Sequence, residues 1–504
     1  MVRSQSSFAI TEASVGMDVN SILRAMVALT VCILVAANAG AQTGASSKQR
    51  LEDVEDHLTR YVVLKNAKGE SMRLAPQMEA MHVPAVSMAA IRDGQLDWAQ
   101  AYGVTALGGA RANPRTLFGA ASMSKPLTAL GVLKLVEEGK VDLDTEVNHY
   151  LKRWKIPDNA FTSEKKVTVR ELLNHTSGIG THNGELYDPG QPIPTLLQML
   201  NGEKPAKSPP VQVEAAPGTK WAYSNGGYLV LQLLIEDVTS EGFAHYMKRA
   251  ILDPTGMEDS TFEAPLPQDW ASRGATAYWE DGKSGIPPEK FVEPNLAAGG
   301  LWSTPTDMAK FLMEIQREYG GTSQKLLHQR TVQMMATPGM SGWGLGFRVG
   351  GSAANPVLSH EGSGVFQDEM LIYLRGNGLV VMTSGGDGAQ LKDELIRSAG
   401  SVYGFPDFQP LERTAVEVAP DVLSRYPGTY GFVKVALEEG KLTAEIPEGS
   451  RPQALFAESP THFFVLDGPQ ELEFEITGQK ADGVVFITPM NHGMHLKRNE
   501  EDRK

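Results

Sequence analysis

The sequence predicts a mixed fold of the α/β (α+β) class: an antiparallel sheet flanked by helices, an all-helical subdomain, and a small all-β domain at the C-terminal end. Three features of the chain predict it. Strand-like segments occur early, at residues 86–102, and again late, at residues 368–383, with a long helical and loop region between them. After residue 411, short alternating segments replace this pattern. Because the early and late strands bracket the helices, we expect distant segments to close one sheet.

The domain organisation follows from the same features and from the length. With 504 residues the chain is long enough for two or three domains, and its 41% hydrophobic and 21% charged residues are typical of a globular protein. We expect a first domain at residues 50–405 and a second at residues 411–500. The net charge of −14 argues against a nucleic-acid partner and against an anionic membrane surface, because neither attracts an acidic protein.

The N-terminal segment predicts a signal peptide at residues 1–41. Arg24 precedes an apolar run at residues 25–37, which is too short to span a bilayer comfortably and is followed by small residues typical of a cleavage site. We expect export to the periplasm or secretion, with Met17 as an alternative translation start. The only cysteine, Cys32, lies in the apolar run and matches a lipoprotein processing site poorly, so no stable membrane anchor is expected; an uncleaved, tethered form is the alternative.

Four segments of the first domain predict regular elements. A hairpin is expected at residues 86–102, with Asp93-Gly94 as its turn, and another at residues 368–383 around a glycine-rich turn. Residues 303–307 combine a hydroxyl cap, a proline and an early acid, as at the start of a helix. Residues 390–403 are expected to form a final helix that packs on the sheet.

Ser122 and Lys125 are the most informative pair of residues. They lie three apart at the head of an apolar stretch, residues 126–136, so on a helix they share a face. Burial lowers the pKa of a lysine, and a neutral amine can take the proton of a serine hydroxyl and make it a nucleophile. Pro126 is tolerated only in the first turn, which places Ser122 at the helix start, where the helix dipole favours an oxyanion.

The same Ser-x-x-Lys spacing arises by chance about once or twice in a chain of this length. Residues 163–166 are such a match, in a charged segment that we interpret as a solvated loop. A catalytic role for Ser122 therefore needs support from other motifs.

Tyr223-Ser224-Asn225 is the first supporting motif. A tyrosine beside a lysine ammonium has its phenolate favoured, so Tyr223 and Lys125 could share the role of general base. Asn225 could bind a substrate amide or orient the lysine. The alternative is a glycine-flanked turn in which the tyrosine only packs.

His360-Glu361-Gly362-Ser363-Gly364 is the second supporting motif. It follows the extended run Pro356-Val357-Leu358, and its glycines would let the backbone approach a ligand closely. The other His-x-Gly, at residues 182–184, lacks a preceding strand pattern, and we interpret it as a loop.

In the order Ser-x-x-Lys, Tyr-x-Asn, His-x-Gly, these motifs resemble the serine β-lactamase and penicillin-binding protein superfamily, in particular the class C β-lactamase-like hydrolases that include DD-peptidases and family VIII esterases. The resemblance covers roughly residues 53–405 and implies the β-lactamase/transpeptidase-like fold. Three further landmarks agree with it: Leu172 to Gly178, Pro254 to Met257, and Ala298 to Pro305.

The resemblance also implies roles for single residues. Ser122 would be the acylated nucleophile, with Lys125 and Tyr223 as the general-base machinery. No metal and no organic cofactor are implied. The resemblance implies that the oxyanion hole is formed by the backbone N–H groups of Ser122 and Ser363. The residues that it implies for substrate binding and the oxyanion hole together are Asn225, His360, Gly362 and Ser363.

Two departures from the family pattern bear on the substrate. Class C β-lactamases carry lysine at the position of His360 and threonine at that of Glu361. A neutral imidazole anchors a carboxylate less well than lysine does, and a nearby glutamate would repel one by about 1 to 4 kcal/mol. An ester, a neutral amide or a peptide whose amine meets Glu361 therefore fits better than a β-lactam, unless Glu361 faces solvent. The turn at residues 364–366 is also one residue shorter than is usual in the family.

The C-terminal region, residues 411–500, alternates in short segments joined by tight turns, which predicts a small antiparallel barrel or sandwich. Its segment 426–430 resembles the opening of the lipocalin-like domains often appended to these hydrolases. A lid or a dimerisation surface without a ligand is the alternative function. The histidines at positions 462, 492 and 495 do not form a persuasive set of metal ligands.

The function expected from the sequence is an exported serine hydrolase that forms an acyl-enzyme on Ser122 and hydrolyses an ester or amide, as an esterase or a D-amino-acid peptidase would. Its partner would be a small-molecule or peptide substrate, and the oligomeric state is left open. The alternatives are a class C β-lactamase or DD-carboxypeptidase, and a penicillin-recognition-like binding protein with little turnover.

Overall fold

The computed structural model describes residues 45–65, 72–181, 185–188, 190–489 and 493–499. The predicted signal peptide, with Met17 and Cys32, and the residues His182 and His492 lie outside the described residues. Within the part that is described, no helix combines the length and the apolar character needed to cross a membrane.

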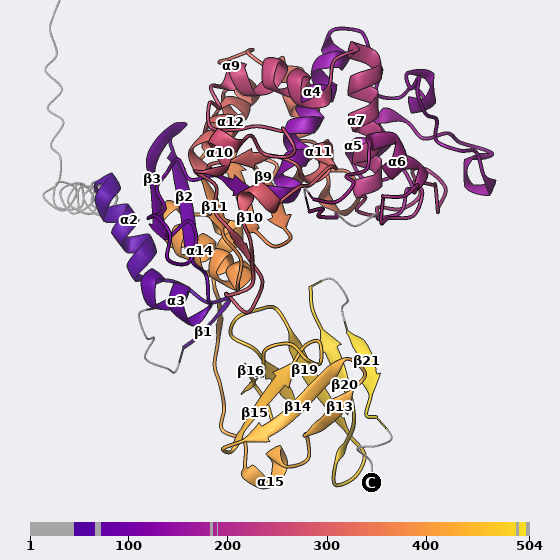
Figure 1. Cartoon of the computed structure of the whole chain (residues 1–504). Helices are drawn as coiled ribbons and strands as arrows, with labels where there is room; N and C mark the ends of the chain where they lie inside the picture. The colour runs from indigo at the N-terminus through magenta and orange to yellow at the C-terminus, as the bar shows by residue number, and fades with distance from the viewer. Residues whose placement is uncertain (1–44, 66–71, 182–184, 189, 490–492, 500–504) are drawn as a thin grey trace, which may run out of the picture. The chain divides into compact units, whose positions relative to one another are not determined.

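A six-stranded antiparallel sheet has the order β3-β2-β11-β10-β9-β8 (Figure 1). The early hairpin joins the late strands directly, because β2 pairs with β11, so the mixed fold with a sheet closed by distant segments is confirmed. Both central residues of the predicted turn, Asp93 and Gly94, have positive φ angles, of 50° and 73°, as a two-residue hairpin turn requires. The strands are β2 (Ala85–Arg92), β3 (Gln95–Gly103), β8 (Arg348–Ser352), β9 (Asn355–Ser363), β10 (Gln367–Tyr373) and β11 (Gly378–Thr383).

The sheet separates two hydrophobic cores. Along β2, Ala89 and Ile91 belong to one core while Met88 and Ala90 belong to the other, since successive side chains of a strand face opposite sides. Helix α12 (Pro305–Tyr319) covers the first face, and α14 (Gly388–Tyr403), the predicted final helix, covers the second. The N-cap of α12 is as the sequence predicts, with Thr304 Oγ1 accepting a hydrogen bond from the Asp307 N–H at 3.2 Å.

The chain between β3 and β8 supplies the helices that carry the site. The central one, α4 (Ser124–Glu137), is buried from Ser124 through Leu133 on every side, and α7 (Asn225–Thr239) packs beside it. The other helices of this region are α5 (Val169–Leu173), α6 (Leu196–Asn201), α8 (Phe243–Met247), α9 (Asp253–Thr255), α10 (Gln268–Ala271), α11 (Leu296–Gly299) and α13 (Gln329–Met335).

The sequence pattern suggested that this region is all-helical, but the structure also contains strands here. Two short antiparallel pairs lie within it: β4 (Phe118–Gly119) pairs with β7 (Trp302–Ser303), and β5 (Ala277–Tyr278) pairs with β6 (Gly285–Ile286). Strands of two residues are too short to show a periodic pattern, so only their tertiary pairing reveals them.

The C-terminal part forms two antiparallel sheets around a hydrophobic cluster of its own, which confirms the predicted all-β character. The domain boundaries stay a prediction, as does the lipocalin-like resemblance. One sheet consists of β13 (Gly428–Tyr430), β14 (Val433–Glu438), β15 (Lys441–Glu445) and β16 (Gln453–Ala454). The other consists of β17 (Phe456–Ala457), β18 (His462–Phe464), β19 (Glu471–Ile476), β20 (Ala481–Ile487) and β21 (Met494–Lys497).

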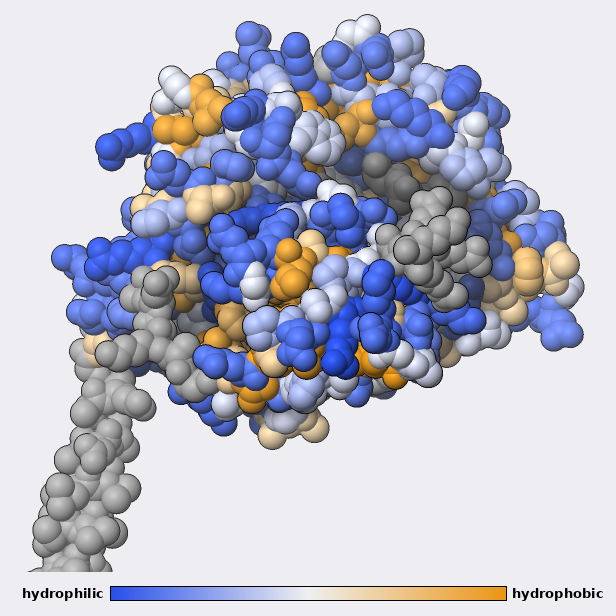
Figure 2. Space-filling model, turned by 90° about the horizontal axis from the view of Figure 1, so that it is seen from below, coloured by the Kyte–Doolittle hydropathy of each residue, from blue (hydrophilic) through white to orange (hydrophobic). Residues whose placement is uncertain are grey.

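The remaining elements are short and lie outside these sheets. Strand β1 (Val62–Leu64) pairs in parallel with β12 (Leu411–Arg413), and the helices are α2 (Ser47–Asp56), α3 (Leu74–Ala80) and α15 (Pro420–Leu423). On the face seen in Figure 2, hydrophilic residues predominate and hydrophobic residues occur in small separate groups. Such a surface agrees with the acidic net charge of −14 and favours solubility.

Candidate active site

Ser122 lies in a single 3-10 turn, Ala121–Met123, immediately before α4. The turn begins with a left-handed residue, since Ala121 has a φ of 43°, a conformation that costs a non-glycine residue roughly 1 kcal/mol. Ser124 Oγ holds it in place by donating to Ala121 O at 2.7 Å and accepting from the Leu301 N–H at 3.0 Å. The position of Ser122 is therefore fixed in part by a bond to a distant segment of the chain.

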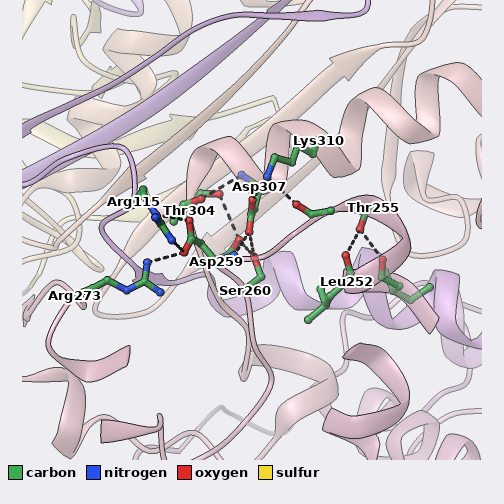
Figure 3. Close-up of polar contacts among 12 residues, drawn as sticks. Arg115, Leu252, Thr255, Asp259, Ser260, Arg273, Thr304, Asp307 and Lys310 are labelled. Atoms are coloured by element: carbon green, nitrogen blue, oxygen red, sulfur yellow. Dashed lines mark hydrogen bonds and ion pairs between the residues drawn. The ribbon is translucent and has the colours of Figure 1, made fainter. Parts of the chain in front are cut away.

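A polar network fixes the strand pair that leads to this turn (Figure 3). Asp307, at the start of α12, accepts hydrogen bonds from the Asp259 N–H at 2.7 Å, from Ser260 Oγ at 2.9 Å and from Lys310 Nζ at 2.8 Å. Arg115, which lies just before β4, binds the Asp259 carboxylate with two nitrogens at 2.9 and 2.8 Å. The network thus ties the chain before β4 to the helix that follows β7.

Lys125 lies where it can take the proton of Ser122. Its Nζ is 2.9 Å from Ser122 Oγ and 2.9 Å from the Ala298 carbonyl oxygen on α11. The side chain has an exposure of 0%, and this burial lowers the pKa of Lys125 to about 7, an effect that the negative charge of Glu293 opposes. Near neutral pH, a large share of the amine is unprotonated and can act as a base.

Tyr223 lies on the other side of the pair, with its ring centroid 4.8 Å from Lys125 Nζ. Burial raises the pKa of Tyr223 above its usual value, and a hydrogen bond with Ser122 lowers it only in part. The phenolate expected from the sequence is therefore not favoured, because desolvation outweighs the hydrogen bond with Ser122. A neutral phenol at this place can pass a proton between groups, while Lys125 is the better base.

Asn225 begins α7, which brings the whole Tyr-x-Asn motif to Ser122. Ser224 caps the helix with its Oγ, which accepts from the Gly227 N–H at 2.9 Å, and the Asn225 N–H donates to Thr181 O at 2.8 Å. The Ser224 N–H donates to Nδ1 of His175 at 3.1 Å, so that imidazole, whose exposure is 1%, is part of the support for the motif.

His360 reaches the site from β9. It is buried, and burial lowers its pKa to about 3, so the imidazole is neutral, as expected. Its Nδ1 lies 2.7 Å from Glu361 O, while Nε2 has no hydrogen-bond partner among the described residues. Gly362 lies against the serine turn, since a Cβ there would approach Ala120 O to 2.6 Å. Ser363 follows Gly362 at the end of the same strand and lines both cavities beside Ser122.

The Glu361 side chain is 55% exposed and lies 3.4 Å from Nζ of Lys392, a buried residue of α14 on the other face of the sheet. Glu361 also lines the cavity that contains Tyr223 and His360. Its exposure agrees with the solvent-facing alternative, and the ammonium of Lys392 offsets part of the repulsion of a substrate carboxylate that the sequence suggested.

Two cavities flank Ser122, and Asn225 and Ser363 line both of them. One has a volume of about 360 Å³ and holds Glu293 and Asn295 among mainly apolar residues. The other has a volume of about 760 Å³ and carries Trp343, Arg348 and His360. A carbonyl group at Ser122 could extend one substituent into each cavity.

Sequence reasoning missed Glu293, Asn295, Trp343 and Arg348 as cavity residues. The Glu-Pro-Asn segment precedes the predicted landmark that begins at Ala298, but a single glutamate near a motif carries no recognisable signal. Within the described ranges, no group of three or more histidine, cysteine, aspartate or glutamate side chains is arranged to hold a metal ion.

Comparison with known proteins adds a family to this geometry. Similar proteins include a penicillin-binding protein of Bacillus subtilis, 24% identical over 74% of this chain and 85% of its own length. The teichoic acid D-alanine hydrolase of Staphylococcus aureus is 27% identical over 59% of this chain and 69% of its own length. The solved octameric penicillin-binding protein homologue from Pyrococcus abyssi is 22% identical with a TM-score of 0.57, covers 84% of this chain and 98% of that one, and so shares the fold. A family model described as Beta-lactamase matches residues 73–402, and the chain therefore belongs to the beta-lactamase family.

Proposed function

We propose that this protein is a serine hydrolase that forms an acyl-enzyme on Ser122 and hydrolyses an ester or an amide. The observation that carries the proposal is the 2.9 Å distance from Ser122 Oγ to Nζ of the buried Lys125, whose pKa is about 7. Membership of the beta-lactamase family supports it, as does the similarity to a teichoic acid D-alanine hydrolase.

The reaction follows from these positions. The Lys125 amine takes the proton from Ser122, and Oγ attacks the substrate carbonyl carbon to give a tetrahedral intermediate. We assign stabilisation of its oxyanion to the backbone N–H groups of Ser122 and Ser363, aided by the N-terminal end of α4. When the intermediate collapses, the bond to the leaving group breaks and the leaving group takes the proton through Lys125 and Tyr223. Water then attacks the acyl ester, regenerating Ser122 and releasing the acid.

A second candidate, a β-lactamase or DD-carboxypeptidase, is favoured by Arg348. This arginine lines the larger cavity with His360 and could bind a substrate carboxylate. Glu361 also lines this cavity, but its carboxylate lies 3.4 Å from Nζ of Lys392, which offsets part of its repulsion of such a substrate. A penicillin-recognition protein with little turnover would use the same cavity.

The test compares hydrolysis of p-nitrophenyl acetate and nitrocefin, and covalent labelling by a fluorescent penicillin, for the protein and for Ser122→Ala. The matched control is Ser163→Ala, which changes the other Ser-x-x-Lys, in an exposed loop. We expect ester turnover that Ser122→Ala abolishes and Ser163→Ala leaves intact. Rapid nitrocefin turnover would favour the β-lactamase, and a stable label without turnover would favour the binding protein. Ester turnover that survives in Ser122→Ala would contradict the proposal.

We also propose that the protein acts outside the cytoplasm, since the sequence before residue 42 has the pattern of a signal peptide. N-terminal sequencing of the protein recovered from the periplasm or the medium is expected to give a start near Ala41. Recovery of a chain that still begins at Met1 or Met17 would contradict export with cleavage.

A further inference from the structure

The smaller cavity beside Ser122 combines apolar walls with one carboxyl group. Glu293 is the acidic side chain among the described residues that line it, and it lies on the segment just before α11, which also supplies the Ala298 carbonyl bound by Lys125. The apolar residues of the lining include Leu186, Trp279, Ile286, Phe291, Val365 and Phe366. A carboxyl group in such surroundings is poorly solvated and gains strongly from a cation placed beside it.

Glu293 has no cationic partner of its own among the described residues. Its Oε1 accepts a hydrogen bond from the Asn295 N–H at 3.3 Å, and Lys125 acts on it only as a more distant charge. Burial raises the pKa of Glu293 to about 8, and the charge of Glu185 adds to the rise. The ionised form is thus under-stabilised in the free protein, and a bound ammonium would stabilise it.

Asn295 supplies an independent sign of a ligand site. Its side chain lines the same cavity, has an exposure of only 6%, and its Oδ1 has no hydrogen-bond partner in the described part of the chain. A buried amide oxygen without a partner is costly, and rotation about the Cβ–Cγ bond can present this oxygen to a donor in the cavity. An ammonium between Glu293 and Asn295 would satisfy both groups.

The two cavities differ in charge. Arg348 and Glu361 both line the larger cavity, and the Glu361 carboxylate also lies 3.4 Å from Nζ of Lys392. In the smaller cavity Glu293 is the one charged side chain among the described lining residues, so a cationic substituent of the substrate fits there, and the volume of about 360 Å³ suits a small group. Since Ser122 lines both, a carbonyl carbon at the serine places its acyl substituent in one cavity and its leaving group in the other.

We infer that Glu293 and Asn295 bind the free ammonium of an α-aminoacyl group, so that the hydrolase prefers small aminoacyl esters or amides with an unblocked amine. This inference rests on the proposed function, because it concerns the acyl group that Ser122 would accept. The two residues act here as specificity determinants, and the chemistry at the carbonyl group is left to Ser122 and Lys125.

The test uses four ethyl thioesters: those of D-alanine, L-alanine, N-acetylalanine and propionic acid. The released thiol is measured with a colour reagent. Alanine carries the ammonium, while the other two acyl groups lack it. We expect kcat/KM for one enantiomer of the alanyl thioester to exceed kcat/KM for the propionyl thioester by at least about tenfold, which is the effect of one charge-assisted hydrogen bond. Glu293→Gln should remove this preference, so that the ratio of alanyl to propionyl kcat/KM falls to about one.

The charge of Glu293 raises the pKa of Lys125, so Glu293→Gln can change the rate for every substrate. The propionyl substrate measures this general effect, because its acyl group carries no ammonium. The matched control is Glu289→Gln, an exposed glutamate four residues earlier, which should leave all rates unchanged. Asn295→Asp is a second variant, and it should retain or strengthen the alanyl preference by adding a negative charge.

Equal turnover of alanyl and propionyl thioesters by the unaltered protein would overturn the inference, and so would an equal loss of both in Glu293→Gln. These results leave Ser122-dependent hydrolysis standing. Absence of any Ser122-dependent turnover would instead overturn the proposed function, and this assignment with it.

Discussion

At the scale of single residues, the proposed chemistry depends on an amine that is buried against uncharged groups. Lys125 contacts a hydroxyl and a carbonyl oxygen, both uncharged, and its exposure is 0%. Its pKa therefore falls toward neutrality, which would let it serve as the base that we propose. The two buried histidines nearby, His175 and His360, have lowered pKa values and are neutral across the working pH range.

The first prediction concerns the pH dependence of turnover. The reactive form of Lys125 is the neutral amine, so kcat/KM for a neutral ester should rise with pH and level off above pH 7, with a midpoint near the lysine pKa of about 7. A substrate without ionisable groups, such as p-nitrophenyl acetate, keeps the substrate from contributing. A profile that falls between pH 6 and pH 8 would show that the charged amine is the active form.

The second prediction concerns the stability cost of the same amine. Burial lowers the pKa of Lys125 in the folded state below its value in the unfolded chain. Between about pH 7 and pH 10 the unfolded state therefore binds more protons, and the contribution of Lys125 to the free energy of unfolding increases with pH. Lys125→Met removes the cost, because a methionine of similar length needs no solvation. We expect activity to be lost and the free energy of unfolding at pH 6 to rise by at least about 1 kcal/mol.

Chemical denaturation of Lys125→Met and of the unaltered protein at pH 6 and pH 9 measures this effect. The gain should be smaller at pH 9, where the folded lysine is neutral. A variant that is less stable at both pH values would show that packing and hydrogen bonds of Lys125 outweigh its desolvation.

Much of the site could be predicted at this scale, and the failures have physical reasons. Ser122, Lys125, Tyr223 and His360 come together as the motifs indicate. The protonation state of Tyr223 could not be predicted, because it depends on the balance between burial and a neighbouring amine. Glu293 and Asn295 were missed, because a cavity wall assembled from distant segments leaves no local pattern.

At the scale of elements, the start of α12 does more than cap a helix. Asp307 has only 1% exposure and binds groups from the segment at residues 259–260, so it joins the helix to the neighbourhood of β7 and β4. Strand β4 leads directly to the turn that carries Ser122. A change at this helix end can therefore reach the nucleophile through the backbone.

The third prediction is that Asp307→Asn lowers the free energy of unfolding by about 1 to 3 kcal/mol, since a buried acceptor of several hydrogen bonds is weakened. We also expect lower kcat with little change in substrate binding, because the Ser122 turn loses support. Asp269→Asn, at an exposed position in α10, is the matched control. Thermal unfolding and ester kinetics of both variants measure the effects; equal behaviour of the two would contradict the role of Asp307.

The long elements were predictable and the short ones were not. The hairpin at Asp93-Gly94, the helix after Ser122 and the helix capped by Thr304 each carry a local signal that the structure matches. The β4–β7 and β5–β6 pairs consist of two-residue strands that exist only through tertiary contacts. The direction of Glu361 depends on the register of β9, which a short polar segment does not reveal.

At the scale of the whole molecule, the first and last parts of the family-matched region are held together by side chains as well as by the sheet. Trp98 of β3 donates from Nε1 to the Tyr403 hydroxyl at 2.6 Å, and that hydroxyl donates to Asp97 at 2.6 Å. Tyr403 ends α14, so these bonds join segments about 300 residues apart. These bonds therefore connect β3, at the edge of the sheet, to the end of the helix that covers its second face.

The fourth prediction follows from this connection. Tyr403→Phe removes the hydroxyl that accepts a hydrogen bond from Trp98 Nε1 and donates one to the Asp97 carboxylate, so the free energy of unfolding should fall by about 1 to 3 kcal/mol while kcat/KM is unchanged. Tyr319→Phe, at the half-buried end of α12, is the control. Loss of activity without loss of stability in Tyr403→Phe would contradict a purely connecting role.

The fold class was predictable because the strands near both ends of the region are short, apolar and bounded by glycine-containing turns, and the intervening helices are apolar. The C-terminal sheets were predictable from their alternation of apolar and polar residues. What these sheets do, and where the domain boundary falls, depends on surfaces that a hydrophobic pattern does not describe.

Strand β9 places residues near the site and residues of the hydrophobic core on opposite faces of the sheet. Leu358 belongs to the hydrophobic core on one side of the sheet, and His360 lines the larger cavity beside Ser122, while Val357 belongs to the core on the side of α14. Directed evolution confined to position 360 and its cavity neighbours could explore new substrates, while thermostabilising changes could be collected separately at position 357 and its neighbours on α14. The two collections should combine with little interference, so this strand offers a natural division of labour for redesigning the catalyst.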